Sequence, residues 1–309
     1  MELKFNGGVW PVMLTPFTDD NQIDYEALEG LIEWYVEKGV SGLFAVCQSS
    51  EMFFLSEQEK VEIASFVKEK VKNRVPVIAS GHTATNLEEH VRQVLQMAQT
   101  GVDAVILIAN RLAKLEDDES VLLKNIYTLL DRLPEDLPLG IYECPYPYKR
   151  LLTSNTLKEI ADTGRFYFLK ETSCDVSTIT EKIKATQNTN LKIYNANAAT
   201  LLESLIQGAV GFSGVMANFQ PELYVWLTKH YKNHPQKANE LQHFLTVSSL
   251  IERQKYPISA KYYLNLEGIA FNTLTRIEPE QQLTATEKLE VEHLYAMTKQ
   301  FKHLFFHEK

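Results

Sequence analysis

The sequence predicts an α/β protein, a (β/α)8 TIM barrel with a C-terminal helical domain, and three observations lead to this prediction. Short apolar runs rich in β-branched residues alternate with longer segments whose apolar residues recur at helical spacing. Eight such runs occur, which is the number that closes a barrel. No glycine-rich phosphate turn follows the first run, although an open doubly wound sheet usually carries one there.

The eight apolar runs are the predicted strands, and amphipathic segments long enough to cross a parallel sheet separate them. The predicted strands are Val9–Thr15, Gly42–Cys47, Val75–Ser80, Ala104–Ala109, Leu137–Tyr142, Phe166–Lys170, Leu191–Asn195 and Val210–Val215. Predicted helices between and after them include Tyr25–Glu37, Glu57–Val71, Leu87–Gln99, Val121–Leu130 and Pro221–His230.

After about Phe219 the strand signals cease and only helical patterns remain. The division predicted from this change is a catalytic barrel over residues 1–220 and a helical region over residues 221–309. Helices are expected at Leu223–Tyr231, Lys237–Glu252, Ile258–Leu266 and Thr286–Phe301. No linker rich in proline, glycine or serine separates the two parts, so we expect them to dock rigidly.

Composition and charge narrow the classes of partner. The chain has 309 residues, 45% of them hydrophobic, and a net charge of −9 with its lysines scattered among acidic residues, so no nucleic-acid partner is expected. Met1–Asn6 lacks the pattern of a signal peptide and no stretch reaches the ~20 apolar residues of a membrane span, which predicts a cytoplasmic protein with no membrane partner. Three widely spaced cysteines predict free thiols and no metal site.

Lys170 ends the sixth predicted strand, and the catalytic groups of a barrel gather at the carboxyl ends of its strands. The residues Phe166–Leu169 before it are aromatic or apolar. Removal from water lowers the pKa of a lysine and supplies the neutral amine that attacks a carbonyl carbon to form an imine. The alternative is a lysine that reaches solvent from a strand end, as most lysines do.

Tyr142 ends the fifth predicted strand and is expected at the same mouth, one strand from Lys170. Imine formation needs proton transfers that a positioned phenol can carry out. The alternative is an amphipathic residue at the barrel rim, which is common for tyrosine. Tyr142 alone therefore does not decide the function.

The turn after the second predicted strand, Cys47–Glu51, brings hydroxyl and backbone N–H groups to the mouth. Such groups bind a carboxylate without a metal. The same segment also leads into a helix, because Ser56 followed by Glu57 and Glu59 is typical of an N-cap. The two interpretations are compatible.

Six ordered markers resemble the dihydrodipicolinate synthase and N-acetylneuraminate lyase family of class I aldolases. They cover most of residues 9–220, and their preserved order and spacing are specific. The markers are Val12–Phe17 with Ile23 and Asp24, Gln48–Glu51 with Leu55 and Ser56, Arg74–Ala79, Gly101–Ala104, Tyr142 with Pro145 and then Leu169–Thr172, and Gln207–Gly211.

The resemblance implies a barrel with a carboxy-terminal helical region, usually assembled as a homotetramer. It implies that Lys170 forms the imine, that Tyr142 shuttles protons near it, and that Ser49 holds a keto-acid carboxylate. Ser213 would line the site from the eighth strand. No cofactor is implied beyond the covalent imine to Lys170.

The chain departs from the family in the turn after the second strand. Cys47, Gln48 and Ser50 stand where the family has glycine, a hydroxyl residue and glycine, so the pocket is expected to be narrower and more polar. Gln48, Ser49 and Ser50 are therefore taken together as predicted substrate-binding residues.

Two further departures concern the second substrate. After the fourth strand, Ala109–Lys114 replaces the adjacent tyrosines that reach a neighbouring subunit's site, so that relay is missing. Pro147 stands in place of the arginine that grips the second substrate's carboxylate. Lys149, Arg150 or Arg111 are candidates to replace it, and Lys149 and Arg111 are predicted to bind substrate.

The resulting hypothesis is a Schiff-base-forming lyase or synthase acting on pyruvate or a related 2-keto acid, with dihydrodipicolinate synthase the nearest named activity. A sugar-acid aldolase or dehydratase is the alternative within the family. A catalytically silent member that binds a small anion is the alternative outside enzymes. The expected partners are the keto acid and further copies of the chain, as a dimer or tetramer.

Overall fold

In the computed structural model, which describes residues 5–307, eight parallel strands form one sheet in the order β1-β8-β7-β6-β5-β4-β3-β2. Their side chains are almost all buried, as expected of parallel strands that are covered on both faces. The strands are β1 Gly8–Val9, β2 Leu43–Val46, β3 Val77–Ala79, β4 Ala104–Ile108, β5 Leu139–Tyr142, β6 Phe166–Glu171, β7 Lys192–Asn195 and β8 Gly211–Phe212.

The sheet closes into a barrel between its two ends. The segment after β1 lies along β2, where Val12 pairs in parallel with Phe44. The Phe44 amide donates to the Pro11 carbonyl at 3.0 Å, and the Met13 amide donates to the Phe44 carbonyl at 3.0 Å. The predicted (β/α)8 barrel is therefore confirmed.

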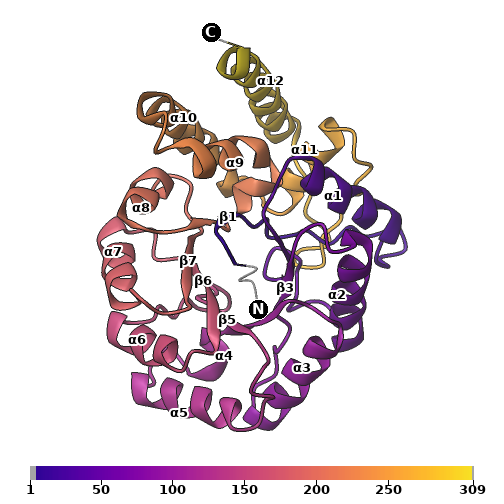
Figure 1. The fold of residues 1–309 in the computed structure, drawn as a ribbon. Helices are drawn as coiled ribbons and strands as arrows, with labels where there is room; N and C mark the ends of the chain where they lie inside the picture. Colours follow the sequence, from indigo (N-terminus) through magenta and orange to yellow (C-terminus); the bar gives the residue numbers. More distant parts are fainter. Residues whose placement is uncertain (1–4, 308–309) are drawn as a thin grey trace.

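Helices surround the barrel, and α10 and α12 project beyond the ring at the top of the view (Figure 1). The helices of the first 220 residues are α1 Tyr25–Glu37, α2 Glu57–Val71, α3 Leu87–Gln99, α4 Ala109–Leu112, α5 Glu119–Leu130, α6 Ser154–Asp162, α7 Val176–Ala185, α8 Leu201–Gln207 and the 3-10 helix η1 Val215–Asn218. They are followed by α9 Pro221–His230, α10 Pro235–Ser248, the 3-10 helix η2 Ser249–Arg253, α11 Ile258–Leu266 and α12 Ala285–His307.

The first and last strands are shorter than predicted. At β1 and β8 the two backbones approach so closely that a Cβ on Gly211 would lie 2.0 Å from the Gly8 carbonyl oxygen, so regular pairing is confined to the glycine-containing segments. The predicted end of the eighth strand at Val215 is instead the start of η1.

The C-terminal helices agree with the pattern except at their ends. The helix predicted at Ile258–Leu266 is observed with those bounds, and α12 extends past the predicted end at Phe301 to His307. The helix predicted over Lys237–Glu252 ends as an α-helix at Ser248 and continues as η2, so Glu252 lies on a tighter turn than expected. The division at residue 220 stays a prediction.

Aromatic rings fill the barrel below its mouth. Phe168 and Tyr194 stack with ring centroids 4.1 Å apart, and Trp10 meets Phe168 edge-on at 5.4 Å. Phe44 packs edge-on against Tyr142, with ring centroids 5.9 Å apart. These packed rings fill the barrel interior next to the strand ends that carry Lys170 and Tyr142.

Between residues 5 and 307, no helix has the length and apolar character needed to cross a membrane.

Candidate active site

A cavity of about 250 Å³ opens at the carboxyl ends of the strands. Side chains from the ends of β5 and β6, from the turn after β2 and from the C-terminal region meet in it. Its lining includes five predicted site residues, namely Gln48, Ser49, Tyr142, Lys149 and Lys170.

Lys170 lines this cavity with only 4% of its surface exposed. Its Nζ is 4.5 Å from the centre of the Tyr142 ring and 5.9 Å from that of Phe44. Burial lowers the pKa of the Lys170 amine, against the opposing influence of Cys47, Cys144 and Glu252. The site therefore favours the neutral amine that nucleophilic attack requires.

This lowered pKa predicts how imine formation varies with pH. The neutral amine is the reactive form, so the rate should rise with pH and level off once the folded-state pKa is passed. We expect the midpoint below 10.5, the ordinary value of lysine. The check is the initial rate of adduct formation with pyruvate and cyanoborohydride, read by intact mass across the pH range. A midpoint at or above the ordinary value would contradict the burial argument.

Tyr142 is paired with Lys170 across the β5–β6 ladder and is also almost fully buried. Burial raises the pKa of the Tyr142 phenol well above its ordinary value, and the hydrogen bond with Cys144 adds to the rise. The phenol is therefore protonated in the resting site. It can donate its proton to a group formed at Lys170 and recover it in a later step.

A buried ion cluster fixes the strand ends that carry these two residues. Glu143 and Glu171, which follow Tyr142 and Lys170 in sequence, both contact Lys182 of α7. Lys182 Nζ is 2.5 Å from Glu143 Oε1 and 2.8 Å from Glu171 Oε1, and all three side chains are at most 1% exposed. Glu171 is thus paired with Lys182, so the sequence neighbour of Lys170 does not hold the Lys170 amine as an ion pair.

The turn after β2 is held from both sides of the cavity. The Cys144 thiol donates to Gln48 Oε1 at 3.3 Å, and the Tyr256 phenol shares a hydrogen bond with Ser49. Glu51, at φ +62°, forms a buried ion pair with Lys261 of α11 at 2.8 Å. The C-terminal region therefore shapes the predicted carboxylate-binding turn.

Three predicted substrate-binding residues lie outside the lining of this cavity. The Ser50 hydroxyl is 2.7 Å from the Met13 carbonyl oxygen and accepts the Cys47 N–H at 3.1 Å, so it braces the turn from behind. Ser213 is fully buried, and its Oγ has no hydrogen-bond partner within residues 5–307. Arg111 lines a different cavity after β4, where its guanidinium lies 4.8 Å from the centre of the Phe53 ring.

Lys149 lines the cavity, and its ammonium makes a hydrogen bond to the protein. Lys149 Nζ donates to the Thr172 carbonyl oxygen at 2.8 Å. Arg150, the other candidate to replace the missing arginine, donates to the carbonyl oxygens of Lys114 and Asp117 and pairs with Glu119. Both cations therefore support loops in the described structure.

Sequence reasoning missed the contribution of the C-terminal region to the cavity. Glu252 of η2 and Tyr256 line it together with Lys170. Their sequence signals are weak, because the surrounding residues read as a helical surface segment. The lining residues Thr172, Cys174 and Asn197 lie within four positions of the end of a predicted strand, so they were detectable from position alone.

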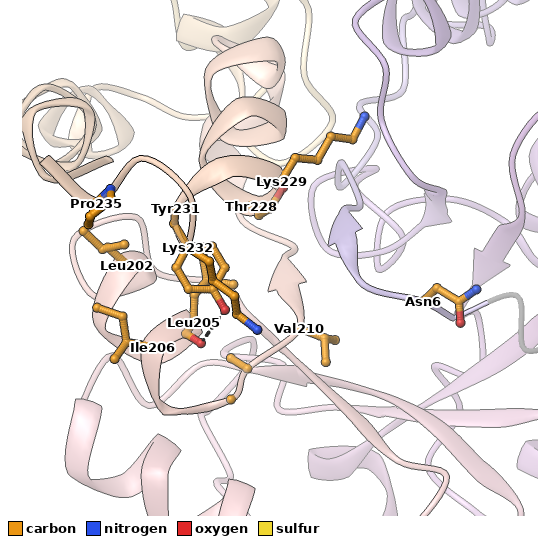
Figure 2. Close-up of a pocket in the computed structure, with 12 residues that line it drawn as sticks. Asn6, Leu202, Leu205, Ile206, Val210, Thr228, Lys229, Tyr231, Lys232 and Pro235 are labelled. Atoms are coloured by element: carbon orange, nitrogen blue, oxygen red, sulfur yellow. Dashed lines mark hydrogen bonds between the residues drawn. The ribbon is translucent and has the colours of Figure 1, made fainter. Parts of the chain in front are cut away.

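The described part of the chain holds no group of three or more His, Cys, Asp or Glu side chains placed to bind a metal. A larger cavity of about 740 Å³ lies elsewhere, beside residues that precede β1 and β8. Figure 2 shows Lys232 beside Tyr231 and Leu205, while the Lys229 side chain extends away from them. This cavity contains none of the predicted site residues.

Comparison with known proteins places this site in a family. The dihydrodipicolinate synthetase family matches residues 5–297. The chain belongs to this family. It is 28% identical over 260 residues to a 4-hydroxy-tetrahydrodipicolinate synthase of Clostridium tetani, covering 83% of this chain and 86% of the relative. The synthase of Haloarcula marismortui is 31% identical over 215 residues, covering 70% of this chain and 68% of that protein.

Solved structures share the fold over almost the whole chain. A prophage protein of the dihydrodipicolinic acid synthase family from E. coli K12, solved in complex with pyruvate, superposes with a TM-score of 0.86 at 24% identity and covers 95% of this chain and 98% of its own. A dihydrodipicolinate synthase gives a TM-score of 0.82 at 25% identity, with 95% and 99% covered. The family resemblance stated from the six markers is confirmed.

Proposed function

We propose that the protein is a lyase or synthase of the class I aldolase type that forms a Schiff base between Lys170 and pyruvate or a related 2-keto acid. The observation that carries the proposal is the buried amine of Lys170, with its lowered pKa, which lines the cavity 4.5 Å from the centre of the Tyr142 ring. Family membership and the named relatives support it. 4-Hydroxy-tetrahydrodipicolinate synthase is the nearest named activity.

The proposed chemistry needs only groups of this chain. The Lys170 nitrogen pair attacks the keto carbon, and the carbonyl oxygen takes up a proton to give a carbinolamine. Loss of water then leaves a C=N bond and an iminium charge on nitrogen. Tyr142, whose ring centre is 4.5 Å from Lys170 Nζ, is proposed to deliver the proton to the departing hydroxyl and to recover it afterwards.

The keto-acid carboxylate is proposed to bind at the turn after β2. Gln48 and Ser49 line the cavity beside Lys170, and turn N–H groups and hydroxyls bind carboxylates well. At about 250 Å³ the cavity suits a ligand of few heavy atoms. Bound in this way, the keto carbon would face the amine.

One observation favours a sugar-acid aldolase or dehydratase over a synthase that condenses its substrate with aspartate semialdehyde. Pro147 occupies the position of the synthase arginine, and Arg111 and Arg150 lie in other contacts. A second carboxylate therefore has no guanidinium partner among the lining residues that the structure describes. Assembly as a dimer or tetramer stays a prediction.

Reductive trapping tests the proposal directly. The protein is incubated with one keto acid at a time, namely pyruvate, 2-ketobutyrate or 2-ketoglutarate, and borohydride is added to each sample. The intact mass of the protein is then measured. We expect one reduced adduct per chain with at least one keto acid, and peptide mapping should locate it on Lys170. If no keto acid gives an adduct but one raises the melting temperature, binding without chemistry becomes the function.

A further inference from the structure

The Tyr142 phenol has a thiol as its hydrogen-bond partner. Cys144 lies two residues after Tyr142, just beyond the end of β5, and its side chain is fully buried. Burial raises the pKa of both groups, and the hydrogen bond between them adds to the rise at Tyr142 and opposes it at Cys144. The phenol is therefore the donor and the sulfur the acceptor, because such a bond stabilises the protonated phenol.

The hydrogen of the Cys144 thiol is directed to the turn after β2. Cys144 Sγ donates to Gln48 Oε1 at 3.3 Å, and the Tyr146 carbonyl oxygen is a second acceptor at 3.5 Å. The backbone of Cys144 is fixed as well, since Asn110 Nδ2 donates to its carbonyl oxygen at 2.7 Å. Tyr142, Cys144 and Gln48 therefore form a chain of side-chain hydrogen bonds from the end of β5 to this turn.

A thiol sulfur suits a phenol that has to give up its proton. Sulfur accepts hydrogen bonds weakly, so it holds the phenol proton less firmly than a carboxylate or a carbonyl oxygen would. The proton stays available to an oxygen that forms at Lys170, whose Nζ is 4.5 Å from the centre of the Tyr142 ring. The titratable groups that act on Cys144 are Lys170, Tyr142 and Cys47. Burial nevertheless raises the pKa of Cys144 to about 11, so the thiol is uncharged at neutral pH.

The same thiol can support the phenol after the proton has left. Loss of the proton leaves a phenolate, which burial makes costly at Tyr142. The S–H group can turn from Gln48 Oε1 to the phenolate oxygen by rotation about the Cβ–Sγ bond of Cys144. The negative charge is then shared between oxygen and sulfur, because both groups are weak acids.

We propose that Cys144 is a positioning residue for the proton chemistry of Tyr142, whose phenol donates to its sulfur and whose phenolate is stabilised by its S–H group. The inference rests on the proposed Schiff-base function and deepens it. Within residues 5–307 the lining of the cavity does not include Cys144, so Cys144 acts on a substrate only through Tyr142. The proton passes from Tyr142 to the departing hydroxyl, which leaves as water, and no oxidant or further reactant takes part.

The other buried thiol near the site has different contacts. Cys47 Sγ is 3.5 Å from Ser50 Oγ and 4.0 Å from the Met13 carbonyl oxygen, so it belongs to the bracing of the turn after β2. It acts on Tyr142 and Cys144 through charge alone. Replacement of Cys144 therefore tests the hydrogen bond to the phenol specifically.

The experiment measures imine formation in the full-length protein with pyruvate and with cyanoborohydride at a concentration where the rate no longer depends on it. Intact mass gives the rate at each pyruvate concentration. We expect Cys144→Ala to lower the limiting rate by on the order of 10²-fold, with the half-saturating pyruvate concentration within about twofold of wild type. Cys144→Ser keeps a donor and an acceptor, so its limiting rate should stay within about fivefold of wild type.

A double-mutant cycle separates action through Tyr142 from a general structural effect. In a Tyr142→Phe background, Cys144→Ala should change the limiting rate by less than about twofold, because the group on which the thiol acts is gone. A structural effect would lower the rate by the same factor in both backgrounds. Val105→Ala, which shortens a buried side chain on the neighbouring strand β4, should lower the melting temperature and keep the wild-type limiting rate.

Melting temperatures show whether the compared variants are folded. Cys144→Val fills the space of the sulfur without a hydrogen bond, and it takes the place of Cys144→Ala if that variant does not fold. The inference is overturned if Cys144→Ala forms the adduct at the wild-type rate, if Cys144→Ser is as slow as Cys144→Ala, or if the loss is undiminished in Tyr142→Phe. Absence of an adduct in wild type with every keto acid tried would instead reject the Schiff-base function on which the inference rests.

Discussion

Lys170→Met should abolish the reduced keto-acid adduct and lower kcat/KM by on the order of 10⁴-fold or more, because the methionine thioether cannot attack a carbonyl and no imine can form. Methionine is close to lysine in length and apolar, and it fits against the Tyr142 and Phe44 rings that now surround the amine. The fold should therefore persist, and the melting temperature should stay the same or rise, since a desolvated amine is removed.

The control for Lys170→Met is Lys158→Met, which removes a positive charge from an exposed pair with Asp162 on α6. This variant should trap pyruvate like wild type. Intact mass after borohydride treatment and steady-state kinetics measure both variants. A wild-type adduct yield in Lys170→Met would show that another amine carries the chemistry.

Lys182→Met should produce the largest loss of stability among single changes near the site. Its ammonium bridges Glu143 and Glu171, and all three groups are buried. Removing one partner of a buried ion pair leaves an uncompensated charge and typically costs about 3–5 kcal/mol. We expect a decrease of that size in the free energy of unfolding, measured by urea denaturation at neutral pH.

The pH dependence of this loss has a definite sign. Burial raises the pKa of Glu143 even with Lys182 present, and removal of the ammonium raises it further. A carboxyl whose folded-state pKa lies above its unfolded value stabilises the fold at low pH and loses that contribution as pH rises. Lys182→Met should therefore be closer to wild type at about pH 5 than at about pH 8.

Lys158→Met is again the matched control, because its partner Asp162 is exposed and such pairs contribute about 0–1 kcal/mol. Equal effects of the two variants would contradict the view that the buried cluster holds the ends of β5 and β6. Loss of activity in Lys182→Met at temperatures where the chain is still folded would further indicate that the cluster positions Tyr142 and Lys170.

Local patterns predicted the barrel because strands and helices leave periodic signals in the sequence. The helix at Ile258–Leu266 and the N-cap at Ser56 follow from short-range rules and were found where expected. Strand ends were less predictable. At Gly8 and Gly211 the extent of pairing depends on how closely two distant backbones approach.

In the candidate site, too, some residue positions were predictable from the sequence and others were not. Lys170 and Tyr142 were predictable because a parallel barrel places the ends of successive strands at one mouth. The positions of Arg111 and Ser50 were not, because the direction in which a side chain beyond a strand end turns depends on partners far away in sequence. Arg111 turns to Phe53, and the Ser50 hydroxyl turns to the Met13 carbonyl.

The sequence by itself determined the barrel, the family and the placing of Lys170 and Tyr142 at one cavity, because these depend on periodicity and on residues at strand ends. Only the tertiary structure decided that Glu171 forms an ion pair with Lys182 and that Glu252 lines the cavity from the C-terminal region. Burial and charge pairing are properties of neighbours brought together by folding, and these neighbours are 11 residues apart for Glu171 and Lys182 and much further apart for Glu252 and Lys170.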